Sequence, residues 1–162
     1  MTPWKCAALL PLAAAALLMS VSCDKAPEGA AAEGVDAKVG TLGSLEVTAK
    51  LEEIPEGAIF KRDLYDYATI LKYKMLKIHR GHIHGETIYV AQYNPFKARS
   101  EAADRRVKDV GGNLKRFQAG QVHRMAMEVP LEDCFMGGVI NKYFGKETGL
   151  LYWAIWTNLA QE

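Results

Sequence analysis

The sequence predicts a mainly β protein: a small β-barrel of about five strands with one or two short helices, preceded by an export signal and a tether. Two observations carry this prediction. Five segments show the apolar patterns of strands and are separated by turns rich in glycine and proline, and one of them, residues 64–79, is too long and irregular for a flat sheet. With 162 residues, a formal net charge of +1 and a mean hydropathy of −0.08, the chain has the size of one domain and is not a polytopic membrane protein.

Residues 1–22 have the layout of an export signal, because Lys5 precedes an apolar block that is too short to span a membrane. The block leads through small residues to Cys23, and this arrangement resembles a bacterial lipoprotein signal, with Ser20 standing where leucine is usual. The resemblance implies a diacylglycerol on Cys23 and a lipid anchor on the periplasmic side of a membrane in the cell envelope. Asp24 resembles an inner-membrane retention mark, but the choice between inner and outer membrane stays open. Ordinary cleavage nearby, which would release a soluble exported product, is the alternative.

Residues 23–43 are expected to be a flexible tether, since they are rich in alanine, glycine and glutamate and lack aromatic residues and apolar periodicity. Of the three cysteines, cleavage would remove Cys6 and acylation would use Cys23. Cys134 would then have no partner for an intrachain disulfide, and we expect it to be a small packing residue. The domain must therefore be stabilised by its core alone.

The folded domain is expected at residues 44–162, with a first strand at residues 45–52, where apolar and polar residues alternate. The second strand covers residues 64–79, and its apolar phase changes near Ile70 and Leu71. We expect a β-bulge there, because a bulge shifts the phase and bends the strand as barrel closure requires. With both ends of this strand packed inward, one core should contain Ala68, Ile70, Leu76, Ile78, Val90, Met125, Met127 and either Trp153 or Trp156.

Three further strands complete the predicted barrel, at residues 87–93, 121–129 and 151–157. We expect one short surface helix after Ser100, which can act as its N-cap, and a second short helix over residues 139–144. The separation of Trp153 and Trp156 is odd, so the two side chains cannot share one face of a regular strand. One of them should be buried and the other more exposed, unless a second bulge intervenes.

Residues 67–81, residues 85–90 and residues 117–127 together form a pattern of strands and turns. The first two segments resemble the x-V-L-x-V-x-K-G strand, tight turn and second strand of OB-fold, netrin-like domains, and the third resembles their later F-x-x-G turn and strand. Netrin-like domains of animal inhibitors carry disulfides that this chain cannot form, so the resemblance implies the barrel fold and no function. The chain as a whole also resembles exported bacterial proteins that accompany alginate-type polysaccharide O-acetylation systems, although no motif in it carries acyl-transfer chemistry.

Three histidines, His79, His82 and His84, lie close together in the predicted hairpin. Neutral imidazoles at such spacing can converge on zinc or copper, and His123 can approach them if the second and fourth strands adjoin. Arg80 beside them disfavours a cation, and turn tips are usually solvated. Exposed hairpin histidines without a metal are therefore the alternative, and we expect no other cofactor.

Positive charge is concentrated in the middle of the chain, since residues 67–127 contain 12 basic and 4 acidic residues, a net charge of +8. A basic surface of this kind attracts anionic polysaccharides or lipid head groups, whereas solvated surface charge without a ligand is the alternative. Export argues against nucleic acid as the partner. The residues expected to form the basic patch are Lys72, Lys74, Lys77, Arg105, Arg106, Lys108, Lys115 and Arg116.

No G-x-S-x-G, H-E-x-x-H or P-loop motif is present in the sequence. We expect a non-catalytic, lipid-anchored binding or scaffold module for an anionic glycan or an envelope partner protein. The alternatives are an accessory factor or enzyme of envelope polysaccharide modification, which rests on the resemblance alone, and a metal-handling protein. Whether any catalysis occurs is left open. Outward-facing tyrosines and tryptophans would add a sugar-stacking surface, but we expect most of them in the core.

Overall fold

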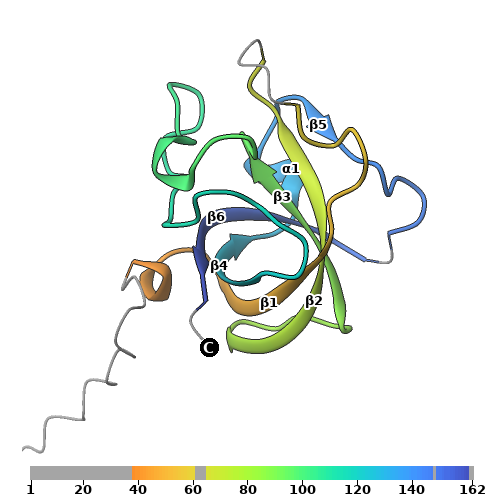
Figure 1. Ribbon diagram of the computed structural model, residues 1–162. Helices are drawn as coiled ribbons and strands as arrows, with labels where there is room; N and C mark the ends of the chain where they lie inside the picture. The colour runs from red at the N-terminus through yellow and green to blue at the C-terminus, as the bar shows by residue number, and fades with distance from the viewer. Residues whose placement is uncertain (1–37, 61–64, 148, 161–162) are drawn as a thin grey trace, which may run out of the picture. The chain divides into compact units, whose positions relative to one another are not determined.

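Closure of the barrel depends on β1 (Leu45–Glu53), which pairs on one side with β2 (Ala68–Arg80) and on the other with β4 (Val122–Glu128). The computed structural model describes residues 38–60, 65–147 and 149–160. In this part of the chain, β3 (Thr87–Tyr93) and β6 (Leu151–Leu159) complete a ring in the order β1-β4-β6-β3-β2, which the β1–β2 pairing closes (Figure 1). The predicted mainly β class and the closed five-stranded barrel are confirmed.

Most strand pairs are antiparallel, but β3 runs parallel to β6, and the additional strand β5 (Val139–Ile140) runs parallel to the start of β2. This strand order is compatible with an OB-like fold. Helical structure in the described residues is limited to the 3-10 turns η1 (Val39–Thr41) and η2 (Arg99–Glu101) and the short helix α1 (Leu131–Cys134). None of these is long and apolar enough to cross a membrane. The predicted export signal, most of the tether and Cys23 lie outside the described residues.

The helix predicted over residues 139–144 is wrong, because this segment contributes β5 instead. Val139 is paired with Ala68 of β2, and β-branched side chains favour the extended backbone of such a pairing. The helix predicted after Ser100 is reduced to the three residues of η2, and no side chain caps it.

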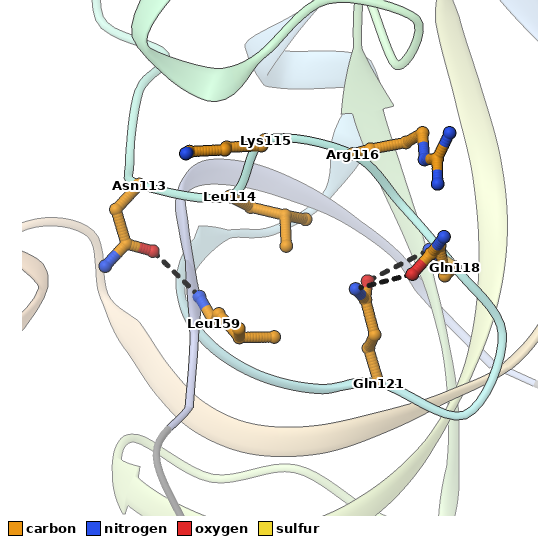
Figure 2. A pocket seen from close by; sticks show the side chains of 7 residues that line it. All are labelled: Asn113, Leu114, Lys115, Arg116, Gln118, Gln121 and Leu159. Carbon is orange, nitrogen blue, oxygen red and sulfur yellow. Dashed lines mark hydrogen bonds between the residues drawn. The ribbon is translucent and has the colours of Figure 1, made fainter.

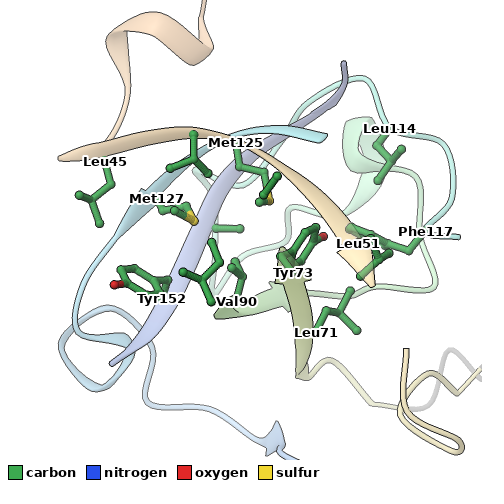
Figure 3. Close-up of a cluster of buried hydrophobic side chains, with 14 residues drawn as sticks. Leu45, Leu51, Leu71, Tyr73, Val90, Leu114, Phe117, Met125, Met127 and Tyr152 are labelled. Carbon is green, nitrogen blue, oxygen red and sulfur yellow. The ribbon is translucent and has the colours of Figure 1, made fainter. Parts of the chain in front are cut away.

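Two apolar clusters occupy opposite sides of the barrel wall, because neighbouring residues of one strand point to opposite faces. The barrel core holds side chains from all five barrel strands and is drawn in Figure 3. The outer cluster holds side chains of β2, β3 and β6 that face away from the barrel, covered by the connections around them. The barrel core comprises Leu45, Val47, Ala49, Leu51, Leu71, Tyr73, Ile88, Val90, Leu114, Phe117, Met125, Met127, Tyr152 and Ala154. The outer cluster comprises Ala68, Ile70, Tyr89, Ala91, Tyr93, Ala102, Val110, Leu131, Tyr143 and Trp153.

The bulge predicted near Ile70 and Leu71 is wrong, since the register between β2 and β3 runs there without a shift. Both faces of this half of β2 are buried: Leu71 packs in the barrel core and Ile70 in the outer cluster. Three register shifts occur where β2 pairs with β1: two leave Leu76 and His79 as extra residues on β2, and the third leaves Glu52 as an extra residue on β1. Leu76 and Ile78 are 51% and 41% exposed rather than in the core, because β2 here extends beyond its pairing with β3.

The two tryptophans of β6 differ in burial as expected. Trp153 is buried in the outer cluster, whereas Trp156 is only half-buried. A second bulge is also present, because the β4–β6 register leaves Ile155 as an extra residue between Ala154 and Trp156. Trp153 does not join Met125 and Met127, so the expectation of one shared core is wrong: the barrel wall separates the two clusters.

Candidate functional site

The long connection between β3 and β4, residues 94–121, covers one end of the barrel. Leu114 and Phe117 of this connection belong to the barrel core. Arg99 is 2% exposed, and its guanidinium donates hydrogen bonds to the backbone carbonyls of Tyr93 at 2.7 Å and Asn94 at 2.6 Å. Burial lowers the pKa of Arg99 to about 10, so the side chain is still charged at neutral pH. Arg99 thus holds the connection in place, and the hydrogen bonds to backbone carbonyls stabilise its buried charge.

The same connection is joined to the second half of β6 by backbone hydrogen bonds. The amide of Gly111 donates to the carbonyl of Ile155 at 2.8 Å, and the amide of Thr157 donates to the carbonyl of Gly111 at 3.1 Å. Gly112 follows with a φ of +125°, and a Cβ there would lie 2.1 Å from the carbonyl oxygen of Thr157. Only glycine fits this close approach, which brings the chain after Gly112 alongside Leu159.

A pocket of about 540 Å³ opens between this connection and the end of β6 (Figure 2). Three amide side chains, two cations and two leucines line it, and we call it the amide pocket. Figure 2 shows Lys115 and Arg116 leaving the backbone in opposite directions, with Leu114 turned into the space below them. No carboxylate is among its lining residues, which are Asn113, Leu114, Lys115, Arg116, Gln118, Gln121 and Leu159. The volume lies in the range of ~300–1,000 Å³ in which proteins bind small ligands.

Hydrogen bonds hold the amides of this pocket in place. Oδ1 of Asn113 accepts from the backbone amide of Leu159 at 2.9 Å. Oε1 of Gln121 accepts from the backbone amide of Gln118 at 3.0 Å, and Nε2 of Gln121 donates to Oε1 of Gln118 at 3.3 Å. The two glutamines therefore form one bonded pair at the rim of the barrel.

A buried histidine lies directly beneath this glutamine pair. His123 of β4 has no exposed surface; its Nε2 lies 3.2 Å from Oε1 of Gln121, and its Nδ1 lies 3.1 Å from the hydroxyl of Tyr73. Burial, and then the positive charge of Arg99, lower the pKa of His123 to about 4. Burial raises the pKa of the Tyr73 phenol. At neutral pH, His123 and Tyr73 are therefore both uncharged.

A second, smaller pocket of about 200 Å³, the histidine pocket, is lined by His82, His84, Thr87, Ile88, Tyr89, Val129, Gly149, Leu150 and Tyr152. His79, the third histidine of the predicted metal set, is not in this lining; its Nε2 lies 2.8 Å from the hydroxyl of Thr48. Within the described ranges, no three histidine, cysteine or acidic side chains gather as a metal site would require. Both ring nitrogens of His123 already have partners, Tyr73 and Gln121, instead of the other histidines. The metal hypothesis stays a prediction without support from the fold.

The basic residues predicted as one patch are distributed over several elements. Lys72, Lys74 and Lys77 lie on β2, where Lys72 is 3.3 Å from a carboxylate oxygen of Glu52. Arg105, Arg106 and Lys108 lie in the β3–β4 connection before Gly111, and Arg106 is 3.1 Å from a carboxylate oxygen of Asp66. Of the eight predicted residues, only Lys115 and Arg116 line the amide pocket.

The aromatic side chains are mostly core, as expected from the sequence. Of the tyrosines between residues 65 and 93 and the tyrosine and tryptophans of β6, Tyr65 is 78% exposed and Trp156 is half-buried. The others are buried: Tyr67, Tyr73, Tyr89, Tyr93, Tyr152 and Trp153. An aromatic platform therefore gains no support.

The amide side chains of the pocket and the buried His123 beneath them were not anticipated as a site. One sequence signal was available, because Asn113, Gln118 and Gln121 flank Lys115 and Arg116 within a short stretch. The chain itself has no match among protein-family models, curated proteins or solved structures. The geometry of the pocket is therefore the basis for a functional proposal.

Proposed function

We propose that this protein is a lipid-anchored binding module of the cell envelope whose amide pocket takes a segment of an acidic glycan. The observation that carries the proposal is the composition of the lining, which combines Lys115 and Arg116 with three amide side chains and contains no carboxylate. Cations attract the anionic groups of a glycan, and amides supply directional hydrogen bonds at fixed positions. Leu159, which is 48% exposed, adds an apolar surface against which the C–H face of a sugar ring can pack.

A binding module is favoured over an enzyme of polysaccharide modification by the same lining. General acid–base catalysis needs a side chain that can exchange protons near neutral pH, and covalent catalysis needs a nucleophile. The side chains around the amide pocket are amides, aliphatic groups and cations. His123 lies nearby but is fully buried, and its nitrogens face Gln121 and Tyr73.

The binding proposal is tested with the full-length chain in detergent micelles, a hexamer of uronic acid, and isothermal titration calorimetry. Replacing Lys115 and Arg116 together by glutamine should weaken binding about three- to tenfold, because each exposed ion pair contributes only a few tenths of a kcal/mol or slightly more. The wild-type affinity should also fall as salt is raised. The matched control replaces Arg105 and Lys108 by glutamine, which removes the same charge outside the pocket. Absence of binding to the hexamer, or an equal effect of both double variants, would reject the proposal.

The anchoring part of the proposal rests on the lipoprotein-like Cys23 and has its own test. Cys23→Ala should move the protein from the membrane fraction to the soluble fraction and remove the lipid from its intact mass. Cys134→Ala serves as the control, because Cys134 is the cysteine of the folded domain and should leave both readouts unchanged. A wild-type protein without lipid mass would refute the anchor.

A further inference from the structure

Every side-chain oxygen in the lining of the amide pocket already accepts a hydrogen bond from the protein. Oδ1 of Asn113 accepts from the backbone amide of Leu159, and Oε1 of Gln118 accepts from Nε2 of Gln121. Oε1 of Gln121 accepts from the backbone amide of Gln118 at 3.0 Å. Lys115 and Arg116 have no acceptor atoms in their side chains. Oε1 of Gln121 also faces Nε2 of His123, so both of its lone pairs are used, whereas the oxygens of Asn113 and Gln118 keep one lone pair each. The polar groups that remain for a ligand are therefore mostly donors.

The orientation of these amides follows from chemistry, because backbone N–H groups can only donate. The atom of Asn113 that faces the amide of Leu159 must be its oxygen, and the atom of Gln121 that faces the amide of Gln118 must also be its oxygen. Nε2 of Gln121 then faces Gln118, so the contacting atom of Gln118 is in turn an oxygen. This leaves Nδ2 of Asn113 and Nε2 of Gln118 without a partner in the described part of the chain.

The buried His123 supports this orientation from below. Its Nε2 faces Oε1 of Gln121, which is an acceptor, so Nε2 carries the proton. Its Nδ1 is then unprotonated and accepts from the hydroxyl of Tyr73. Since both groups are uncharged and enclosed in the barrel, the ring donates toward the pocket in one fixed tautomer. A flipped Gln121 amide would place its NH₂ against two donors, the Nε2–H of His123 and the amide of Gln118.

We propose that the amide pocket is a donor-rich site that selects the oxyanion groups of a glycan, and that His123 is the positioning residue that keeps Oε1 of Gln121 turned toward the amide of Gln118. The inference rests on the proposed function and specifies its ligand chemistry. Oxyanions such as carboxylates only accept hydrogen bonds, so each of their oxygens can be satisfied in the pocket. A sugar hydroxyl also has a proton to donate, and the lining side chains offer only the second lone pairs of the Asn113 and Gln118 oxygens to receive it.

The first experiment compares the uronic acid hexamer with its carboxyl-reduced form, in which each carboxylate becomes a neutral CH₂OH group. The wild type should prefer the uronate form. Gln118→Met keeps the shape of the side chain but removes its free donor, and it should weaken binding of the uronate roughly three- to tenfold, with little effect on the reduced form. His123→Phe keeps a ring in the core but removes the contact to Gln121, and it should weaken uronate binding similarly. Tyr93→Phe, which removes a hydrogen bond to Asp104 in another part of the fold, controls for general destabilisation.

The second experiment determines the tautomer and charge of His123 without a ligand. Long-range ¹H–¹⁵N NMR spectra of the full-length protein at pH 7 should show His123 neutral, with the proton on Nε2. A proton on Nδ1, or a charged ring, would overturn the inference whether or not a glycan binds. Uronate affinity that is unchanged in both Gln118→Met and His123→Phe would also overturn it, while leaving the proposed function intact. A wild type that binds no hexamer would instead reject the proposed function itself.

Discussion

The guanidinium of Arg99 lies 4.9 Å from the centre of the Phe117 ring, beneath the connection that covers the end of the barrel. The same group donates hydrogen bonds to the carbonyls of Tyr93, Asn94 and Lys97. The backbone amide of Arg99 donates in addition to the carbonyl of Leu114 at 2.8 Å. One buried cation therefore ties both ends of the β3–β4 connection to each other and to the barrel core.

Replacing Arg99 by methionine should lower the free energy of unfolding by about 3 kcal/mol, because it leaves buried carbonyls without their charged donor. Urea denaturation followed by circular dichroism measures this loss. Arg105→Met removes an exposed arginine from the same connection and should change the free energy of unfolding by less than about 0.5 kcal/mol. Equal stability of the two variants would show that Arg99 does not hold the connection.

The two tryptophans of β6 should differ in their contribution to stability. Trp153 stacks on Phe135 with a centroid distance of 4.9 Å and an interplanar angle of 12°, and it is 5% exposed. Trp153→Ala should therefore cost about 3–5 kcal/mol, a large part of the total stability of a small domain. Trp156 is half-buried beneath Lys38, so Trp156→Ala should cost only about 1–2 kcal/mol. Chemical denaturation of both variants tests the order, and the reverse order would contradict the assignment of the outer cluster.

The first strand was predictable because its side chains alternate with a period of two, and this period survives in the second half of β1, where Ala49 and Leu51 are buried and Lys50 and Glu52 are exposed. The pattern failed in β2 for a physical reason. A strand that is buried on both faces has no polar positions to mark its phase, so Ile70 and Leu71 look like a shift in alternation when they simply face different clusters. The outer cluster also contains side chains from the segments between the strands, and the alternation within a strand gives no information about these segments.

The site was less predictable than the fold, because it is assembled from parts that lie far apart in the chain. Net charge identified Lys115 and Arg116, but it also identified basic residues on β2 that do not line the pocket. Leu159 lies beside Asn113 because backbone hydrogen bonds join the connection to β6, and the amide of Leu159 then donates to Oδ1 of Asn113. The role of His123 depends on which atom of Gln121 faces it, and this is set by a backbone amide rather than by sequence spacing.

The close approach at Gly112 should be essential for the position of the amide pocket. Gly112→Ala would place a methyl group 2.1 Å from the carbonyl oxygen of Thr157, at a φ of +125° that side chains rarely adopt. We expect a loss of more than about 2 kcal/mol in the free energy of unfolding. Gly138→Ala is the control, because a Cβ there meets nothing within 4 Å and the φ is not positive. Thermal or urea unfolding measures the stability of both variants. An unchanged free energy of unfolding in Gly112→Ala would show that the close contact between Gly112 and β6 is not needed for stability.

The depressed pKa of His123 makes the stability of the barrel dependent on pH. The ring takes up a proton near pH 6.5 in the unfolded chain but only near pH 4 in the folded protein, because of its burial and the nearby Arg99. Between these values the unfolded state binds more protons, so the free energy of unfolding decreases as the pH falls from about 6.5 to about 4. The decrease from this one group is on the order of 3 kcal/mol, and it is absent above pH 6.5.

His123→Phe should remove this component, so the difference in unfolding free energy between the wild type and the variant should shrink as the pH is lowered through this window. His82→Gln is the control for removing a histidine, because its ring is exposed. Urea denaturation at several pH values measures the curves, and an NMR titration of the His123 ring locates its pKa directly. A wild-type curve parallel to that of His123→Phe between pH 7 and pH 4 would show that the buried ring titrates normally and that its contacts to Tyr73 and Gln121 are not held as described.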